Sequence, residues 1–250
     1  MDNPQPQPQV VPVTEYVQRV FVPVSRLAHN WQMHSAVLLT PAEDRAMARE
    51  PAAAVPATVA QRIGLLRVLL VPYVACVPEA DLITWTKPDG ETHSAVWVEG
   101  KERVDLVLPC RELDAHDTGF EFLASVAELL RPRLHSDEID RFTELIVEEL
   151  RVGVSGEIDD AARAAKRHTA GGHGRRPSDE QFESYRNVSF VSTMAEYMHG
   201  LWHDVQVNVG PEHLPVRNLR SRMELLAELF PPNSGYSVFS KELEDGPPIE

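Results

Sequence analysis

Two histidines and a glutamate near residue 200 have the types and the spacing that could hold a metal ion. Glu196, His199 and His203 follow the pattern Glu-x-x-His-x-x-x-His. Residues three and four positions apart share one face of a helix, so two imidazoles can reach a single cation there. A carboxylate on the same face can act as a third ligand or as a general base. We therefore predict a divalent metal site, for a cation such as zinc, with Glu196 also as the candidate catalytic residue.

This segment differs from the metal-binding helices whose spacing it shares. The two histidines are spaced as in the zinc-protease motif HExxH, but Gly200 follows the first one where that motif has glutamate. Carboxylate-bridged sites in four-helix bundles use two Glu-x-x-His pairs, and this segment supplies one. The metal site is therefore predicted from residue types and spacing alone, without the mechanism of either class.

A long helix over residues 178–204 is expected to position these side chains. Between residues 187 and 204 the apolar residues fall within one arc centred near Met194, while Ser192 and the candidate ligands occupy the opposite sector. The sequence from 187 to 204 contains no Lys or Arg. An exposed helix face of this length normally carries several long cations, so we expect this polar face to border a cleft or a partner surface. The alternative is an ordinary solvated helix face.

A complete metal site would need a further ligand, and five side chains elsewhere in the chain could supply it: His213, Glu212, Glu148, Glu149 and Glu157. Such a site predicts a metal-binding protein and, where metal-bound water faces a cleft, a metal-dependent hydrolase. The alternative function is a non-catalytic interaction or regulatory protein that binds a protein partner. It is kept because the sequence contains no complete catalytic motif.

The remaining candidate ligands have simpler explanations. Cys76 and Cys110 are too few for a disulfide scaffold and lack the paired spacing of a zinc ribbon or a redox motif, so we expect buried free thiols. The cluster of acids around His116, residues 114–117, could bind a cation. A turn that precedes a helix cap at Thr118 accounts for the same residues.

The rest of the chain predicts an α+β fold, with a central antiparallel meander of three to four strands followed by a predominantly helical C-terminal half. The stretches 82–86, 94–98 and 104–108 are rich in β-branched and aromatic residues and are separated by turn sequences. Residues 69–76 form the candidate fourth strand.

Apolar residues at helical spacing predict the helices. In the N-terminal part they indicate an amphipathic helix over 13–24 and a further helical repeat from Val59 to Leu70, and Thr40 is a plausible cap for a helix that ends by Pro51. In the C-terminal half they predict helices over 120–130, 136–150, 159–168, 178–204 and 221–229.

Composition excludes several classes of partner. The chain has 24 Lys and Arg against 38 Asp and Glu, a formal net charge of −14. This charge repels phosphate backbones and anionic membrane surfaces, so nucleic acid is not expected as a ligand. No apolar run approaches the ~18 residues of a membrane span, and the N-terminus lacks the pattern of a secretory signal. We expect a soluble, acidic, cytoplasmic protein that does not bind membranes.

Length and composition predict one globular domain over residues 13–240, with 110–117 as the place where it would divide. Residues 1–12 alternate Pro with Gln and have almost nothing to bury, so a disordered tail is expected there. Residues 241–250 are acidic and contain two prolines, which predicts a second flexible tail.

Overall fold

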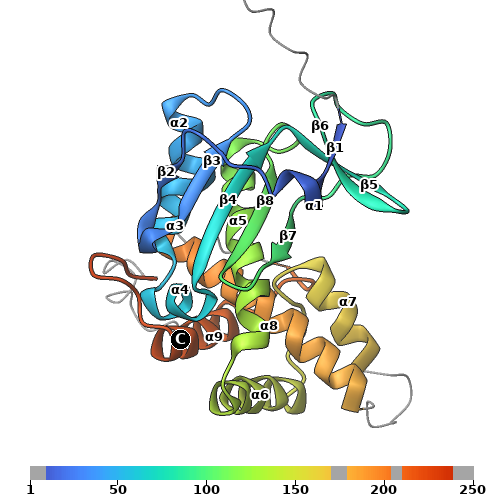
Figure 1. The fold of residues 1–250 in the computed structure, drawn as a ribbon. Helices are drawn as coiled ribbons and strands as arrows, with labels where there is room; N and C mark the ends of the chain where they lie inside the picture. The colour runs from blue at the N-terminus through green and yellow to red at the C-terminus, as the bar shows by residue number, and fades with distance from the viewer. Residues whose placement is uncertain (1–9, 170–178, 204–209, 239–250) are drawn as a thin grey trace, which may run out of the picture. The chain divides into compact units, whose positions relative to one another are not determined.

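The computed structural model describes residues 10–169, 179–203 and 210–238 (Figure 1). The chain divides into two compact units: the first comprises Met1–Ala53 and Ile63–Ser125, and the second comprises Ala54–Arg62 and Val126–Glu250. Unit 1 contains all the described strands and unit 2 is built from helices. The predicted α+β class and the helical C-terminal half are thus confirmed, while the single domain over 13–240 stays a prediction.

The larger sheet of unit 1 is mixed. Its strand order is β2-β3-β4-β8-β7, with bounds Ser25–Arg26, Gln32–Ser35, Leu65–Val71, Arg103–Pro109 and Val96–Glu99. Strands β3, β4 and β8 run parallel, while β2 and β7 are antiparallel at the edges. The central strands β4 and β8 are buried from their second residue onward, which explains their nearly unbroken apolar sequences.

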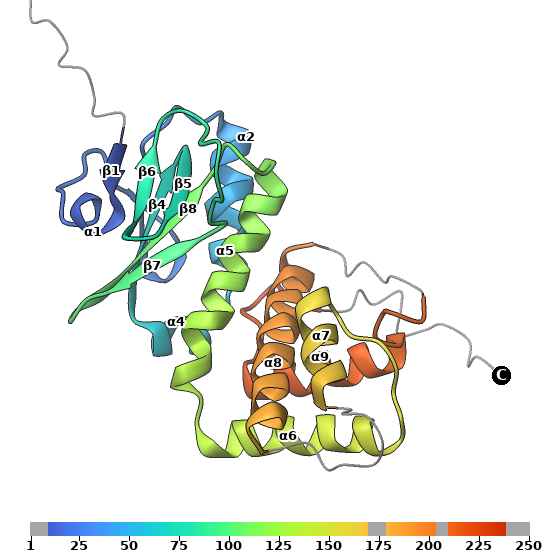
Figure 2. The ribbon, with the colours of Figure 1, turned by 90° about the vertical axis from the view of Figure 1, so that its right-hand side faces the viewer.

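Helical segments cover one face of this sheet. Residues 41–54 are helical throughout, as α2 (Pro41–Asp44), a π-helical turn (Arg45–Arg49) and α3 (Glu50–Ala54). Figure 2 shows α2 and the first part of α5 (Ala115–Leu130) on the same side of the sheet. Trp31 and Phe122 meet there with ring centroids 6.1 Å apart.

A smaller sheet and the N-terminal segment cover the opposite face. This sheet has the order β1-β6-β5, with bounds Val10–Pro12, Ala80–Thr84 and Tyr73–Val77. Together with α1 (Val13–Tyr16) it forms a core cluster against Leu69, Val71 and Val107. Alternation along β4 places Leu69 and Val71 on this face, beside Val107 of β8, and Leu66, Val68 and Leu70 on the other.

Several local expectations for unit 1 need correction. The predicted strand 82–86 corresponds to β6, which pairs with β5 and β1 and not with the strand over 94–98. The helix expected over 13–24 ends at Tyr16, and Val20 and Val22 are 91% and 82% exposed. The helical repeat to Leu70 ends with α4 (Ala57–Ile63), because the following apolar residues enter β4.

Unit 2 is a set of packed helices. After α4, the end of α5 and a 3₁₀ turn (Arg131–Arg133), the chain forms α6 (Ser136–Arg151), α7 (Asp160–Thr169), α8 (Asp179–Trp202) and α9 (Val216–Leu229). Helix α8 packs against α6, α7 and α9. Asn233 ties α4 to the end of α9, because its side chain accepts from the N–H of Ala57 and donates to the carbonyl of Val55.

The predicted tails lie mostly outside the described residues. Residues 1–9 and 239–250 are not described, so the C-terminal tail and most of the N-terminal tail cannot be compared. Residues 10–12 of the expected tail form β1, because Val10 and Val11 pair with Thr84 and Ile83 of β6. Within the described part of the chain, no helix combines the length and apolarity needed to cross a bilayer.

Candidate metal centres

The predicted ligands lie together at the C-terminal end of α8. Glu196 and His199 are on the helix, with 3.8 Å between the carboxylate oxygen Oε1 and the imidazole Nδ1. His203 is the first residue after the helix, and its ring centroid lies 5.8 Å from that of His199. His199 is buried whereas His203 is exposed. The three side chains are neighbours in different environments, and their binding of a metal stays a prediction.

A cavity of about 170 Å³ lies beside this end of α8. The residues that line it come from α8, from the segment before α7, from the segment that leads into α9 and from α9 itself: Glu157, Ile158, Glu196, His199, His213, Leu214 and Leu219. Two of the five further ligands named from sequence, Glu157 and His213, are therefore brought to Glu196 and His199. His203 is not among the lining residues.

Backbone pairing fixes His213 beside this cavity. Glu157 donates its N–H to the carbonyl of Glu212 at 3.0 Å, and Leu214 donates to the carbonyl of Glu157 at 3.1 Å. Gly156 has φ +73°, and a Cβ at this position would lie 2.1 Å from the carbonyl oxygen of His213. The two segments can approach so closely only because residue 156 is glycine.

Glu157 is held by protein cations and a phenol. Arg222 donates to both of its carboxylate oxygens at 2.9 Å, Lys166 Nζ lies 3.3 Å from Oε1, and the Tyr185 hydroxyl donates to Oε1. Burial alone would raise the pKa of Glu157, but these partners outweigh it and lower the pKa below its usual value. The Glu157 carboxylate is thus a buried anion whose charge is already paired within unit 2.

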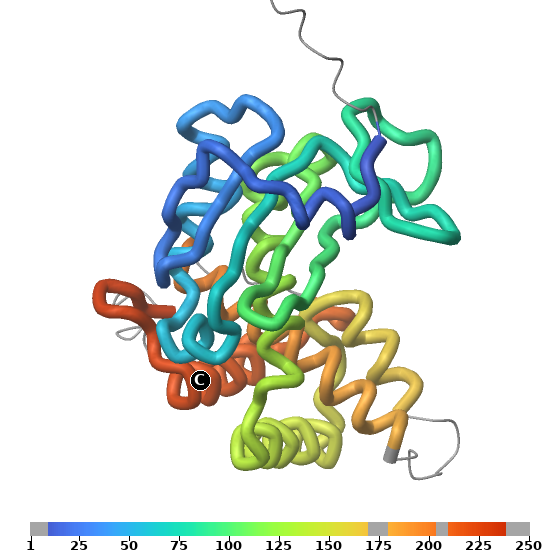
Figure 3. The backbone as a smooth tube through the Cα atoms, in the orientation of Figure 1, coloured from blue at the N-terminus to red at the C-terminus, as the bar shows by residue number. Residues whose placement is uncertain are grey.

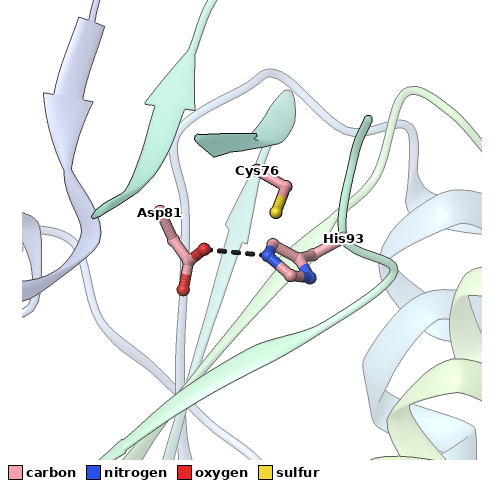
Figure 4. Close-up of side chains that lie close together, drawn as sticks. All are labelled: Cys76, Asp81 and His93. Carbon is pink, nitrogen blue, oxygen red and sulfur yellow. Dashed lines mark hydrogen bonds and ion pairs between the residues drawn. The ribbon is translucent and has the colours of Figure 1, made fainter. Parts of the chain in front are cut away.

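A second cluster, which the sequence reasoning did not assemble, lies in unit 1. One ligand atom from each of Cys76, Asp81 and His93 lies within 4.8 Å of the other two (Figure 4). Nε2 of His93 is 2.8 Å from Oδ1 of Asp81, and these side chains are 35% and 40% exposed. Cys76 is exposed. The expectation of a buried thiol at residue 76 is therefore wrong.

Strand register explains why these three residues meet. Cys76 and Asp81 are direct partners in the β5–β6 hairpin, so their side chains share one face. The chain then returns along the other edge of β5, where Cys76 donates its N–H to the carbonyl of Glu91 and His93 donates to the carbonyl of Val74 (Figure 3). His93 therefore reaches Cys76 diagonally across the strand. The spacing of Cys76, Asp81 and His93 along the sequence matches no known ligand motif, so the sequence did not indicate that they are neighbours. The turn after Val77 does indicate a hairpin.

The cluster at Asp114, His116 and Asp117 also brings three ligand atoms within 4.8 Å. Its members are all exposed, and Asp114 caps α5 by accepting the backbone N–H of Asp117 at 2.8 Å. The hydroxyl of Thr118 donates to the carbonyl of Asp114. Helix capping thus accounts for this arrangement, but the cap is Asp114 and not Thr118 as expected, because α5 already begins at Ala115.

Comparisons with family models, with curated proteins and with solved structures found no match for this chain. The chemistry of the side chains is therefore the basis for any functional conclusion.

Proposed function

We propose that this protein binds a divalent transition metal, zinc above all, through Cys76, Asp81 and His93. The observation that carries the proposal is the convergence of a sulfur, a nitrogen and an oxygen ligand within 4.8 Å. Metal binding is the function that the sequence favoured, and the ligands proposed here differ from those expected on α8.

The ligand set suits zinc. Zinc takes thiolate, imidazole and carboxylate ligands in tetrahedral geometry, and three protein ligands leave a position for water or a small ligand. A soft thiolate together with an imidazole disfavours magnesium and calcium, which prefer oxygen ligands. Partial exposure of Asp81 and His93 leaves the centre open to an entering ion.

The geometry supports a metal centre better than a nucleophilic cysteine. In a nucleophile–histidine–acid triad the two imidazole nitrogens face different partners, one the nucleophile and one the acid. In Figure 4 the sulfur of Cys76 and the carboxylate of Asp81 both lie toward the His93 nitrogen that faces Asp81, and the second ring nitrogen lies on the other side of the ring. Ligands gathered around one point are the arrangement that a cation requires.

Titration of untagged full-length protein with Zn²⁺ and Co²⁺ tests the proposal. Co²⁺ should give a thiolate-to-metal charge-transfer band that Zn²⁺ abolishes. Cys76→Ser should remove this band, and His93→Gln should weaken Co²⁺ binding at this centre at least ~10-fold, since changes to metal surroundings typically cost that much. His116→Gln, a change in the capping cluster of unit 1, is the control. A wild-type protein without the band, or a band that survives Cys76→Ser, would overturn the proposal.

Thiol alkylation gives an independent measurement, because the same protein carries both the thiol to be tested and a reference thiol. Cys110 is buried, and burial raises the pKa of its thiol to about 11, so it serves as an internal reference. Iodoacetamide should modify Cys76 in the metal-free protein and leave Cys110 intact. Saturating Zn²⁺ should slow the modification of Cys76, because a thiolate bound to metal is not free to attack iodoacetamide. Equal rates with and without Zn²⁺ would count against a metal bound by Cys76.

A further inference from the structure

We infer that the cavity at the end of α8 is a second cation site, with Glu196, His199 and His213 as its protein ligands. Two imidazoles and one carboxylate form the ligand set of several zinc hydrolases, in which water fills the remaining position. The site lies in unit 2 and shares no residue with the Cys76 centre. It therefore stands or falls independently of the proposed function.

The first argument is that the three side chains line one small space. The cavity of about 170 Å³ has room for a cation with several waters. Glu196 and His199 already lie 3.8 Å apart at Oε1 and Nδ1, and their side chains are 16% and 9% exposed. His213 is 31% exposed, so the third ligand stands nearer the solvent than the other two.

The second argument is the sign of the charge on the cavity wall. The described lining residues include two glutamates and two histidines but neither Lys nor Arg. The charge of Glu157 is already balanced by Arg222 and Lys166. The carboxylate of Glu196 therefore supplies negative charge that a bound cation would neutralise.

The third argument is that the third ligand is held by the fold. The backbone bridge between Glu157 and His213 depends on the close approach at Gly156. The buried ion pairs of Glu157 anchor one side of this bridge, while α8 carries the other two ligands. The helix and the fixed bridge thus hold the three side chains at one cavity. Their ligand atoms do not all lie within 4.8 Å of one another, so the side chains must close around an entering ion.

His213 thus takes the place that the sequence assigned to His203. His203 adjoins His199, but it is exposed and lies beyond the last residue of α8, outside the cavity lining. A cation held in the cavity by Glu196, His199 and His213 would polarise a bound water or a carbonyl oxygen, which is the chemistry of a metal-dependent hydrolase.

Metal stoichiometry in a protein without the first centre tests this inference. In untagged full-length protein that carries Cys76→Ser and His93→Gln, equilibrium dialysis should find one bound Zn²⁺. His199→Gln, His213→Gln or Glu196→Gln in this background should each weaken its binding at least ~10-fold. His203→Gln is the matched control and should leave the affinity unchanged. Thermal unfolding of each variant shows whether the fold is retained.

The outcomes separate the two sites. No bound Zn²⁺ in the Cys76→Ser/His93→Gln protein overturns this inference and leaves the proposed function standing. Loss of binding with His203→Gln but not with His213→Gln overturns the ligand set in favour of the one expected from sequence. Equal stoichiometry in the wild type and in the Cys76→Ser/His93→Gln protein overturns the proposed function alone.

Discussion

Arg222 is a fully buried cation whose guanidinium joins α9 to three other segments of unit 2. It donates to the carboxylates of Glu149 on α6 and Glu157 before α7, and also to the hydroxyl of Ser189 on α8. The Arg222 side chain is 0% exposed. Two buried acids share this cation, and Lys166 is a second cationic partner for Glu157 alone. Removal of Arg222 should therefore be far more damaging than loss of a surface pair.

Arg222→Ala should lower the free energy of unfolding by about 3–5 kcal/mol, because it removes the cation that two buried carboxylates share. Arg220→Ala is the control on the same helix: Arg220 pairs with Glu224 on the surface, and its loss should cost about 1 kcal/mol or less. Urea unfolding of the two variants measures the difference. Similar losses for both would show that the buried network adds nothing beyond a surface ion pair.

At the scale of elements, the bridge between residues 156–158 and 212–214 fixes the candidate site in unit 2. Gly156 and Gly153 have the same φ of +73°, but a Cβ at residue 153 would meet nothing within 4 Å. Alanine at residue 153 would therefore cause backbone strain alone, whereas alanine at residue 156 would cause the same strain together with a steric clash.

Gly153→Ala should cost about 1–2 kcal/mol of stability, the usual cost of a left-handed conformation for alanine. Gly156→Ala should cost clearly more, because its methyl group collides with the backbone at His213. It should also weaken Zn²⁺ binding in the Cys76→Ser/His93→Gln protein, whereas Gly153→Ala should not. Chemical denaturation and equilibrium dialysis measure the two effects. Equal effects of both substitutions would contradict the role given to the bridge.

Local patterns predicted the helices of unit 2 better than the sheets of unit 1. The stripes in α6 and α8 are properties of neighbouring residues, so the expected ranges 136–150 and 178–204 lie close to the observed bounds. The parallel pairing of β4 with β3 and β8 joins distant segments. Pairing between distant segments leaves no local pattern in the sequence. The apolar residues of β4 were therefore interpreted as a continuation of the preceding helix.

The same limit applied to the candidate sites. Spacing on one helix predicted that Glu196, His199 and His203 would be neighbours, because helix geometry is local. It could not place His213 at their cavity, since this depends on the pairing of two loops. Nor could it assemble Cys76 on β5 with His93, which lies on the returning segment that pairs with β5.

For the whole molecule, the pH dependence of stability tests how much the carboxylates contribute, since Asp and Glu outnumber Lys and Arg. Glu138 at the start of α6 accepts from both terminal nitrogens of Arg62 and from the N–H of His135. Burial would raise its pKa, but these hydrogen bonds prevail and lower it, as the partners of Glu157 do for that residue. A carboxyl with a lowered folded pKa contributes stability that is complete above the unfolded pKa and is lost as pH falls through the folded value.

Stability should therefore be nearly constant from neutral pH down to about 4.5, the ordinary carboxyl value, and fall below it. Glu138→Gln should lower stability at neutral pH and flatten the fall at acidic pH. Glu144→Gln, a change at an exposed position of α6, is the control and should keep the wild-type profile. Urea unfolding at a series of pH values measures these profiles. If Glu138→Gln lost stability at acidic pH as the wild type does, Glu138 would not be a source of the acid dependence.

The β5–β6 hairpin and its return to His93 also bear on the order of assembly. Cys76, Asp81 and His93 all come from one short stretch of chain, so bringing them together closes only short loops. This stretch precedes β8, one of the two central strands of the larger sheet, in the chain and therefore emerges from the ribosome before it. A metal ion bound to the nascent hairpin would order it early. To the extent that the same ligands bind zinc in the unfolded chain, zinc should influence the rate of folding more than the final stability.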